Sequence, residues 1–114
     1  MISRVRICST AEQVGLVSVV LSHRGGLEGA LDSNDGTVIV VDLGDARVEP
    51  FDLLEDIGNA KLVREIVTIG FFSHVMIEQK QRAKALGCDL ILPRSEFFKR
   101  LPDLLVEKAS GLER

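Results

Sequence analysis

The sequence predicts an α/β fold, an open parallel sheet covered by helices on both faces. Three segments are continuously apolar and rich in β-branched residues, a pattern typical of strands buried on both faces: residues 37–43, 65–71 and 89–92. Stretches with helical spacing of apolar residues alternate with them, which favours parallel strands joined by right-handed crossovers. With a further apolar run at 16–21, we expect four strands in one domain over residues 1–114.

The N-terminal segment is predicted to be a helix over residues 2–14 that ends at Gly15. A strand over residues 4–8 is the alternative. Too few residues separate it from the apolar run at 16–21 for a parallel crossover, which needs about a dozen. The helix is therefore the better interpretation, and the run at 16–21 becomes the first strand.

The middle of the chain predicts a strand, a helix and a second strand. The strand at 37–43 follows a turn cluster at 33–36. Pro50 suits the first turn of a helix that Gly58 and Asn59 would end. Its apolar residues have helical spacing: Phe51, Leu54 and Ile57.

The C-terminal part predicts a helix at 75–86 that Gly87 ends, and then a strand at 89–92 that Pro93 stops. Ser95 would cap a short turn. Pro102 reopens a helix, so we expect a break near Leu101 rather than one straight terminal helix, with a frayed tail at 111–114.

Composition excludes several classes of protein. The chain has 14 Lys+Arg against 17 Asp+Glu, a net charge of −3, and it shows no basic cluster of the kind that binds nucleic acid. Five Phe without Trp or Tyr make a base-stacking platform improbable. Cys8 and Cys88 fit no zinc or redox spacing and are expected to be buried in a reducing cytosol. No membrane segment or leader is visible, so we expect a cytoplasmic protein without metal or cofactor.

Three features, in this order along the chain, resemble the receiver domain of two-component response regulators. They are the apolar run at 38–43 that ends in an acid, the segment Ala83–Asp89 before the last strand, and Arg94 just after that strand. The resemblance extends from about residue 1 to 106. It is closer to degenerate pseudo-receivers, and it implies a flavodoxin-like order of strands.

The resemblance also implies a set of site residues. Asp42 matches the phosphoacceptor at the end of the third receiver strand, Gly70 matches the switch Ser/Thr, and Arg94 matches the invariant Lys. A receiver begins with a strand that ends in an acidic pair holding Mg²⁺. Here the first receiver helix starts at about Met1, so that strand and its acidic pair are missing from this sequence.

These departures argue against phosphoryl transfer. A lone carboxylate lacks the metal and the cation that neutralise charge on the transferred group. Arg94 replaces the Lys charge only in part, and Asp45 is a weak candidate for a metal ligand. We therefore expect Asp42 to cap loop amides or to pair with Arg94.

Other residues at the same sheet edge have two interpretations each. His74 is either a base or ligand near Asp42 or a hydrogen-bonded loop residue, and Ser73 is more typical of a helix N-cap than of a nucleophile. The Gly-rich segment at 23–26 lacks a phosphate-binding pattern and favours a plain turn. A third hypothesis is a small-molecule or anion site lined by these residues: Asp42, Gly70, His74 and Arg94.

The resemblance places a partner surface on the last two helices and the last strand. Adjacent helical residues diverge by about 100°, so we expect one of Phe97 and Phe98 to be exposed. The missing strand leaves a gap that a shifted strand, a second copy of the chain or a start upstream of Met1 would explain, and we favour a homodimer. The surface comprises Met76, Gln79, Lys80, Arg94, Phe97 and Phe98.

The function expected from the sequence is a non-catalytic, receiver-like interaction module in signalling, with an unknown protein partner. An atypical receiver phosphorylated on Asp42 is the alternative. The small-molecule site is the third.

Overall fold

A computed structural model of the 114-residue chain describes residues 2–15, 27, 36–46, 49–73 and 77–112. Helices and strands alternate from β1 onward, as expected for an α/β fold. No helix in the described ranges is long and apolar enough to cross a membrane. The elements are α1 (Ile2–Gln13), β1 (Gly36–Asp42), α3 (Pro50–Ala60), β2 (Glu65–Phe72), α4 (Ile77–Ala85), β3 (Leu90–Pro93) and α5 (Arg94–Leu112).

The described strands form a parallel sheet in the order β1-β2-β3. Asp42 at the end of β1 is the register partner of Phe71 on β2, which in turn pairs with Leu92 on β3. The three strands therefore end at one edge of the sheet, where open α/β folds place their functional groups. The predicted strand at 16–21 and the predicted turn at 23–26 lie outside the described residues.

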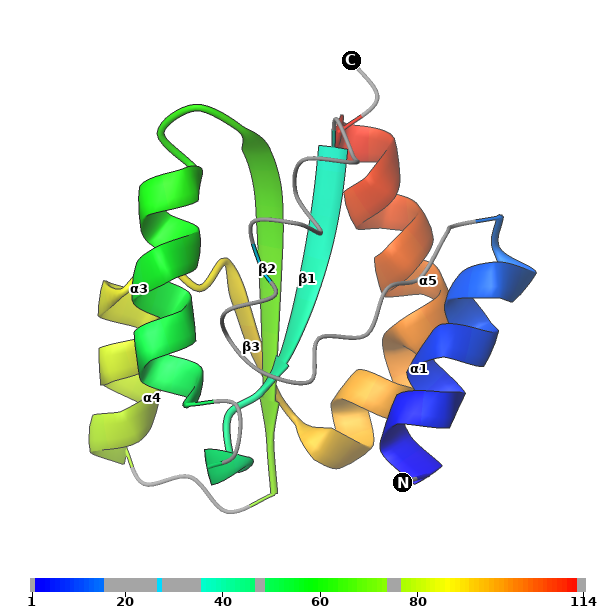
Figure 1. Cartoon of the computed structure of the whole chain (residues 1–114). Coiled ribbons are helices and arrows are strands. Elements are labelled where there is room, and N and C mark those ends of the chain that lie inside the picture. The colour runs from blue at the N-terminus through cyan, green and yellow to red at the C-terminus, as the bar shows by residue number, and fades with distance from the viewer. Residues whose placement is uncertain (1, 16–26, 28–35, 47–48, 74–76, 113–114) are drawn as a thin grey trace.

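Helices cover both faces of this sheet, which confirms the predicted architecture. Figure 1 shows α3 and α4 on one side of the sheet and α5 on the other, with α1 beside α5. The core under α3 and α4 contains Leu27, Ile39, Val41, Leu43, Leu53, Leu54, Ile57, Ile66, Ala83 and Cys88. The core under α5 and α1 contains Ala11, Ile69, Phe71, Leu92, Phe97, Phe98, Leu101, Leu104 and Leu105.

Two glycines end helices as predicted. Gly15 after α1 has φ +84° and Gly87 after α4 has φ +96°, a region that side chains with a Cβ disfavour. Gly58 does not end α3, which continues to Ala60. A Cβ at Gly58 would lie 3.4 Å from the Leu86 carbonyl oxygen, so this glycine marks a close approach between the helix and the end of the α4 segment.

The expected break near Leu101 is wrong, because α5 is continuous from Arg94 to Leu112 with Pro102 inside it. The expected short turn capped by Ser95 is instead the start of this helix, directly after β3. Proline removes the donor to the carbonyl four residues earlier. Here that carbonyl, on Phe98, accepts a hydrogen bond from Arg6 of α1. Burial of Leu101 and Leu104 also holds the helix against the sheet.

Pro93 does not stop β3 but forms its last residue, paired with Phe72. A proline is tolerated there because it stands at the end of the ladder, on the last strand of the described sheet.

Candidate functional site

Asp42, the predicted phosphoacceptor position, closes the loop that follows β1. Its Oδ1 accepts a hydrogen bond from the Gly44 amide at 3.0 Å, and its carbonyl oxygen accepts one from the Asp45 amide at 3.1 Å. A carboxylate that binds an amide two residues on forms an Asx turn. The expectation that Asp42 caps loop amides is confirmed.

The same loop ends in an uncommon backbone conformation. Glu49, just before α3, has φ +47°, a left-handed conformation that costs a non-glycine residue about 1 kcal/mol or more. Its side chain makes no capping hydrogen bond to α3. The loop after Asp42 thus begins with a side-chain cap and ends in a residue of uncommon backbone conformation.

Arg94 lies on an aromatic surface. Its guanidinium carbon is 5.0 Å from the centre of the Phe98 ring and 5.7 Å from that of Phe71. Phe71 is the register partner of Asp42, and register partners present their side chains on the same face of a sheet. Arg94 and Asp42 therefore share one face at the carboxyl edge, with the Phe71 ring against the guanidinium.

Gly70 faces the other side of the sheet. It pairs with Val41 and is buried, and an added Cβ would lie 3.1 Å from Leu43 Cδ1 and 3.2 Å from Cys88 Sγ. The structure therefore does not bring Gly70 onto the face of Asp42 and Arg94. Close packing explains why the position has no side chain. His74, the fourth predicted site residue, lies outside the described residues.

The described residues do not fit a Mg²⁺ site. Mg²⁺ prefers carboxylate oxygens and water in octahedral geometry. Within the described ranges no group of three His, Cys, Asp or Glu side chains is placed to hold a metal. One oxygen of Asp42 is also engaged by the Gly44 amide.

Two residues of the predicted partner surface are buried. Gln79 and Lys80 are exposed on α4, as expected, and Met76 lies outside the described residues. Phe97 and Phe98 are both buried, at 0% and 7% exposure. The expected exposure of one ring fails because α5 lies between the sheet and α1, so both directions from the helix are covered (Figure 1).

The rings form a compact aromatic cluster with the strand edge. Phe71 stacks on Phe97 at 4.7 Å between ring centres, and Phe98 meets both rings edge to face at 5.6 and 5.0 Å. Such pairs contribute about 0.5–1.5 kcal/mol each beyond the burial of their surface. The cluster therefore fixes α5, and with it Arg94, against the carboxyl edge of the sheet.

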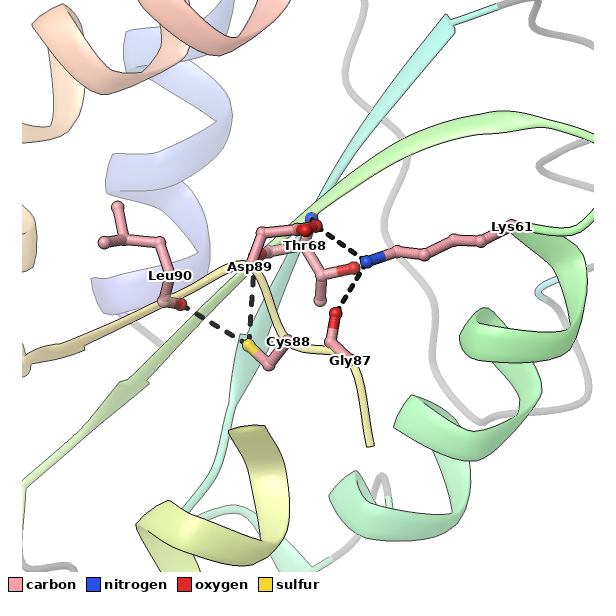
Figure 2. Close-up of polar contacts among 6 residues, drawn as sticks. All are labelled: Lys61, Thr68, Gly87, Cys88, Asp89 and Leu90. Carbon is pink, nitrogen blue, oxygen red and sulfur yellow. Dashed lines mark hydrogen bonds and ion pairs between the residues drawn. The ribbon is translucent and has the colours of Figure 1, made fainter. Parts of the chain in front are cut away.

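A second polar group, missed by the sequence reasoning, lies at the start of β3. Asp89 Oδ2 accepts hydrogen bonds from Lys61 Nζ at 2.7 Å and from the Thr68 amide at 2.8 Å (Figure 2). Lys61 also donates to the Gly87 carbonyl oxygen at 2.6 Å, and the Asp89 amide donates to the Thr68 carbonyl oxygen. We call Lys61, Thr68 and Asp89 the clamp, because they tie the end of α3 to β2 and β3.

The clamp gives Asp89 a backbone-like role. Regular pairing of β2 with β3 begins at Ile69 and Leu90, so the carboxylate supplies the acceptor for the Thr68 amide one residue before the ladder. The Thr68 hydroxyl is fully buried and has no hydrogen-bond partner in the described structure. A lysine and an aspartate 28 residues apart carry no local sequence signal, which explains why the motif was missed.

Cys88, next to the clamp, is a buried free thiol as expected, and Cys8 is half-buried. The Cys88 thiol donates to the Leu90 carbonyl oxygen at 3.4 Å. Burial raises the pKa of Cys88, so the thiol stays protonated at neutral pH and is a poor nucleophile.

Comparison with known proteins supports the fold. A response regulator from Thermotoga maritima has a similar crystal structure, with a TM-score of 0.72, 12% sequence identity, and coverage of 96% of this chain and 89% of that chain. No family model matches the sequence, and no curated protein does. The chain therefore has a receiver-like α/β fold.

Two substitutions of Asp42 distinguish the hydrogen bond that its side chain accepts from the Gly44 amide from the negative charge of its carboxylate. Asp42→Asn keeps an oxygen that accepts from the Gly44 amide, and we expect the free energy of unfolding to change by less than about 0.5 kcal/mol. Asp42→Ala removes the acceptor and should destabilise the protein by about 1 kcal/mol. Urea denaturation of both variants measures the difference, and equal losses would contradict a capping role.

Substitutions in the clamp test its contribution to stability in the same way. Asp89→Ala leaves the Thr68 amide without its acceptor and should cost about 1–3 kcal/mol, whereas Asp89→Asn retains an acceptor and should cost less. Lys61→Met should cost under about 1 kcal/mol, because the Lys61–Asp89 pair is partly exposed.

Thr68→Val is the matched control for the clamp. It keeps the backbone amide and removes the buried hydroxyl, so urea denaturation should show no loss of stability. A loss as large as that of Asp89→Ala would show that the Thr68 side chain, not its amide, holds the clamp.

Proposed function

We propose that this protein is a degenerate, pseudo-receiver interaction module that acts by protein contact and is not phosphorylated on Asp42. The observation that carries the proposal is the Gly44 amide bound to Asp42 Oδ1, since the oxygen is held by the loop of its own chain. The receiver-like fold supports a place in signalling.

The arrangement of cations supports the same proposal. Phosphoryl transfer to a carboxylate needs positive charge at the acceptor. Arg94 is drawn onto the Phe71 and Phe98 rings, and a planar guanidinium does not reproduce a lysine ammonium. The described residues also fail to assemble a Mg²⁺ site.

The surface proposed for a partner is α4 with its exposed apolar residue. Among the described side chains of α4, Ala83 is the buried one, and Ile77 is 75% exposed beside Gln79 and Lys80. A helix that buries one small residue presents the rest of its surface for contact. With Phe97 and Phe98 buried, α4 replaces them as the centre of the proposed surface.

Beryllofluoride, a phosphoryl analogue, tests the proposal directly. With millimolar Mg²⁺ and beryllofluoride, we expect the amide resonances of residues 42–46 and 70–73 to stay unchanged in ¹H–¹⁵N spectra. Asp42→Asn is the control. Shifts in the native protein that disappear in Asp42→Asn would overturn the proposal in favour of a working phosphoacceptor.

We also propose that the chain forms a homodimer. Among the described strands β1 stands at an edge of the sheet. Strand edges recruit other chains. Light scattering after size exclusion should give twice the 12.5 kDa chain mass over a tenfold concentration range, and a well-folded monomer would overturn the dimer.

A further inference from the structure

Helix α4 is held on the sheet through one side. Among its described side chains Ala83 is fully buried, and Leu86, just after the helix, packs half-buried against the same core. The Arg82 guanidinium lies over the Phe51 ring of α3, with its carbon 4.5 Å from the ring centre. These contacts fix α4 beside α3, on the same face of the sheet (Figure 1).

Another side of α4 carries a stripe of exposed residues without an acid. Helical geometry places positions 77, 80, 81 and 84 within an arc of about 100°, and the residues that hold the helix, Arg82 and Ala83, fall outside this arc. The acid of the helix, Glu78, falls outside it as well. All four residues are exposed, and Ile77 is 75% exposed. We call them the lysine stripe: Ile77, Lys80, Gln81 and Lys84.

The two lysines of the stripe have no charge partner among the described residues. Helix α4 holds three cations and one acid, a net charge of +2 in a chain whose net charge is −3. Neither the Lys80 nor the Lys84 ammonium forms a hydrogen bond or an ion pair with a described residue. At physiological ionic strength charges are screened beyond about 8 Å. A molecule docked on the stripe therefore meets these two lysines rather than the net negative charge of the whole chain.

We propose that the lysine stripe is the docking site for an acidic amphipathic helix of another protein, which rests on the interaction function proposed above for α4. Positions i, i+3, i+4 and i+7 are those through which one helix meets another. Acids one turn apart on the partner pair with Lys80 and Lys84, which are themselves one turn apart, and an apolar partner residue covers Ile77. A second copy of the chain is the less favourable occupant, because two facing α4 helices bring their net positive charges together.

Two synthetic helical peptides test the proposal by titration of the ¹⁵N-labelled full chain. They have the same length and the same leucine face, which is flanked by glutamates in one peptide and by lysines in the other. The glutamate peptide should shift the amide resonances of residues 77–85 and bind about tenfold or more tightly than the lysine peptide, with an affinity that falls as salt is added. Equal binding of both peptides, shifts confined to other elements, or no shift with millimolar glutamate peptide would overturn the proposal.

Substitutions in the stripe show whether its charges carry the binding. The double variant Lys80→Gln, Lys84→Gln removes both charges and keeps helix propensity, so the affinity for the glutamate peptide should fall about fivefold. Ile77→Ala should lower it about threefold, because less apolar surface is covered. Lys99→Gln is the matched control on α5, where Lys99 is also exposed, and should leave the affinity unchanged. Unchanged affinity in the double variant, or an equal loss in the control, would contradict docking on the stripe.

The peptide titration and the beryllofluoride test fail separately. Beryllofluoride shifts that depend on Asp42 would overturn the unphosphorylated module, whatever binds to α4. Failure of the glutamate peptide to bind α4, with resonances that beryllofluoride leaves unchanged, would overturn the acidic partner alone.

Discussion

The aromatic cluster of Phe71, Phe97 and Phe98 is the contact on which the rest of the structure depends. It joins the central strand β2 to α5, and its ring contacts lie between 4.7 and 5.6 Å. The guanidinium of Arg6 on α1 also lies over the Phe98 ring, so the cluster connects the sheet to α1.

The cluster also determines the electrostatics of the carboxyl edge. Arg94 is attracted to the ring faces, where a cation gains about 0.5–1 kcal/mol at an exposed site and more when desolvated. Asp42 binds the amide of its own loop. Acid and cation thus each have a structural role on the same face of the sheet, and the proposal of a module that is not phosphorylated on Asp42 rests on this arrangement.

At the start of β3 the clamp joins the end of α3 to strands β2 and β3. Asp89 supplies an acceptor to β2 through its side chain, and Lys61 ties the same oxygen to the end of α3. The segment Ala83–Asp89, which carried much of the resemblance to receivers, is explained by these contacts and by packing. Ala83 is fully buried, Gly87 has a positive φ, and Cys88 lies against Gly70.

The features predicted correctly from the sequence are those with a local cause. β-Branched runs predicted all three described strands, and glycines at 15 and 87 predicted two helix ends, because each depends on residues close in the chain. The Asx turn of Asp42 spans two residues and is local in the same way.

The features predicted wrongly depend on distant partners. Pro102 does not break α5, and the Phe98 carbonyl that it leaves without a helical donor accepts a hydrogen bond from Arg6, 92 residues away. Phe98, on α5, is buried because the sheet and α1 cover the helix from two sides, which no helical spacing reveals. The clamp was missed for the same reason, since its side chains come from separate elements.

The position of the Arg94 side chain tests the central claim most directly. Protons held over an aromatic ring are shifted upfield, so NMR of the native protein should show upfield-shifted Arg94 Hδ resonances, with nuclear Overhauser contacts to the ring protons of Phe71 and Phe98. Unshifted Hδ resonances with contacts to the Hβ protons of Asp42 would contradict the account, because they would place the cation at the acid rather than on the rings.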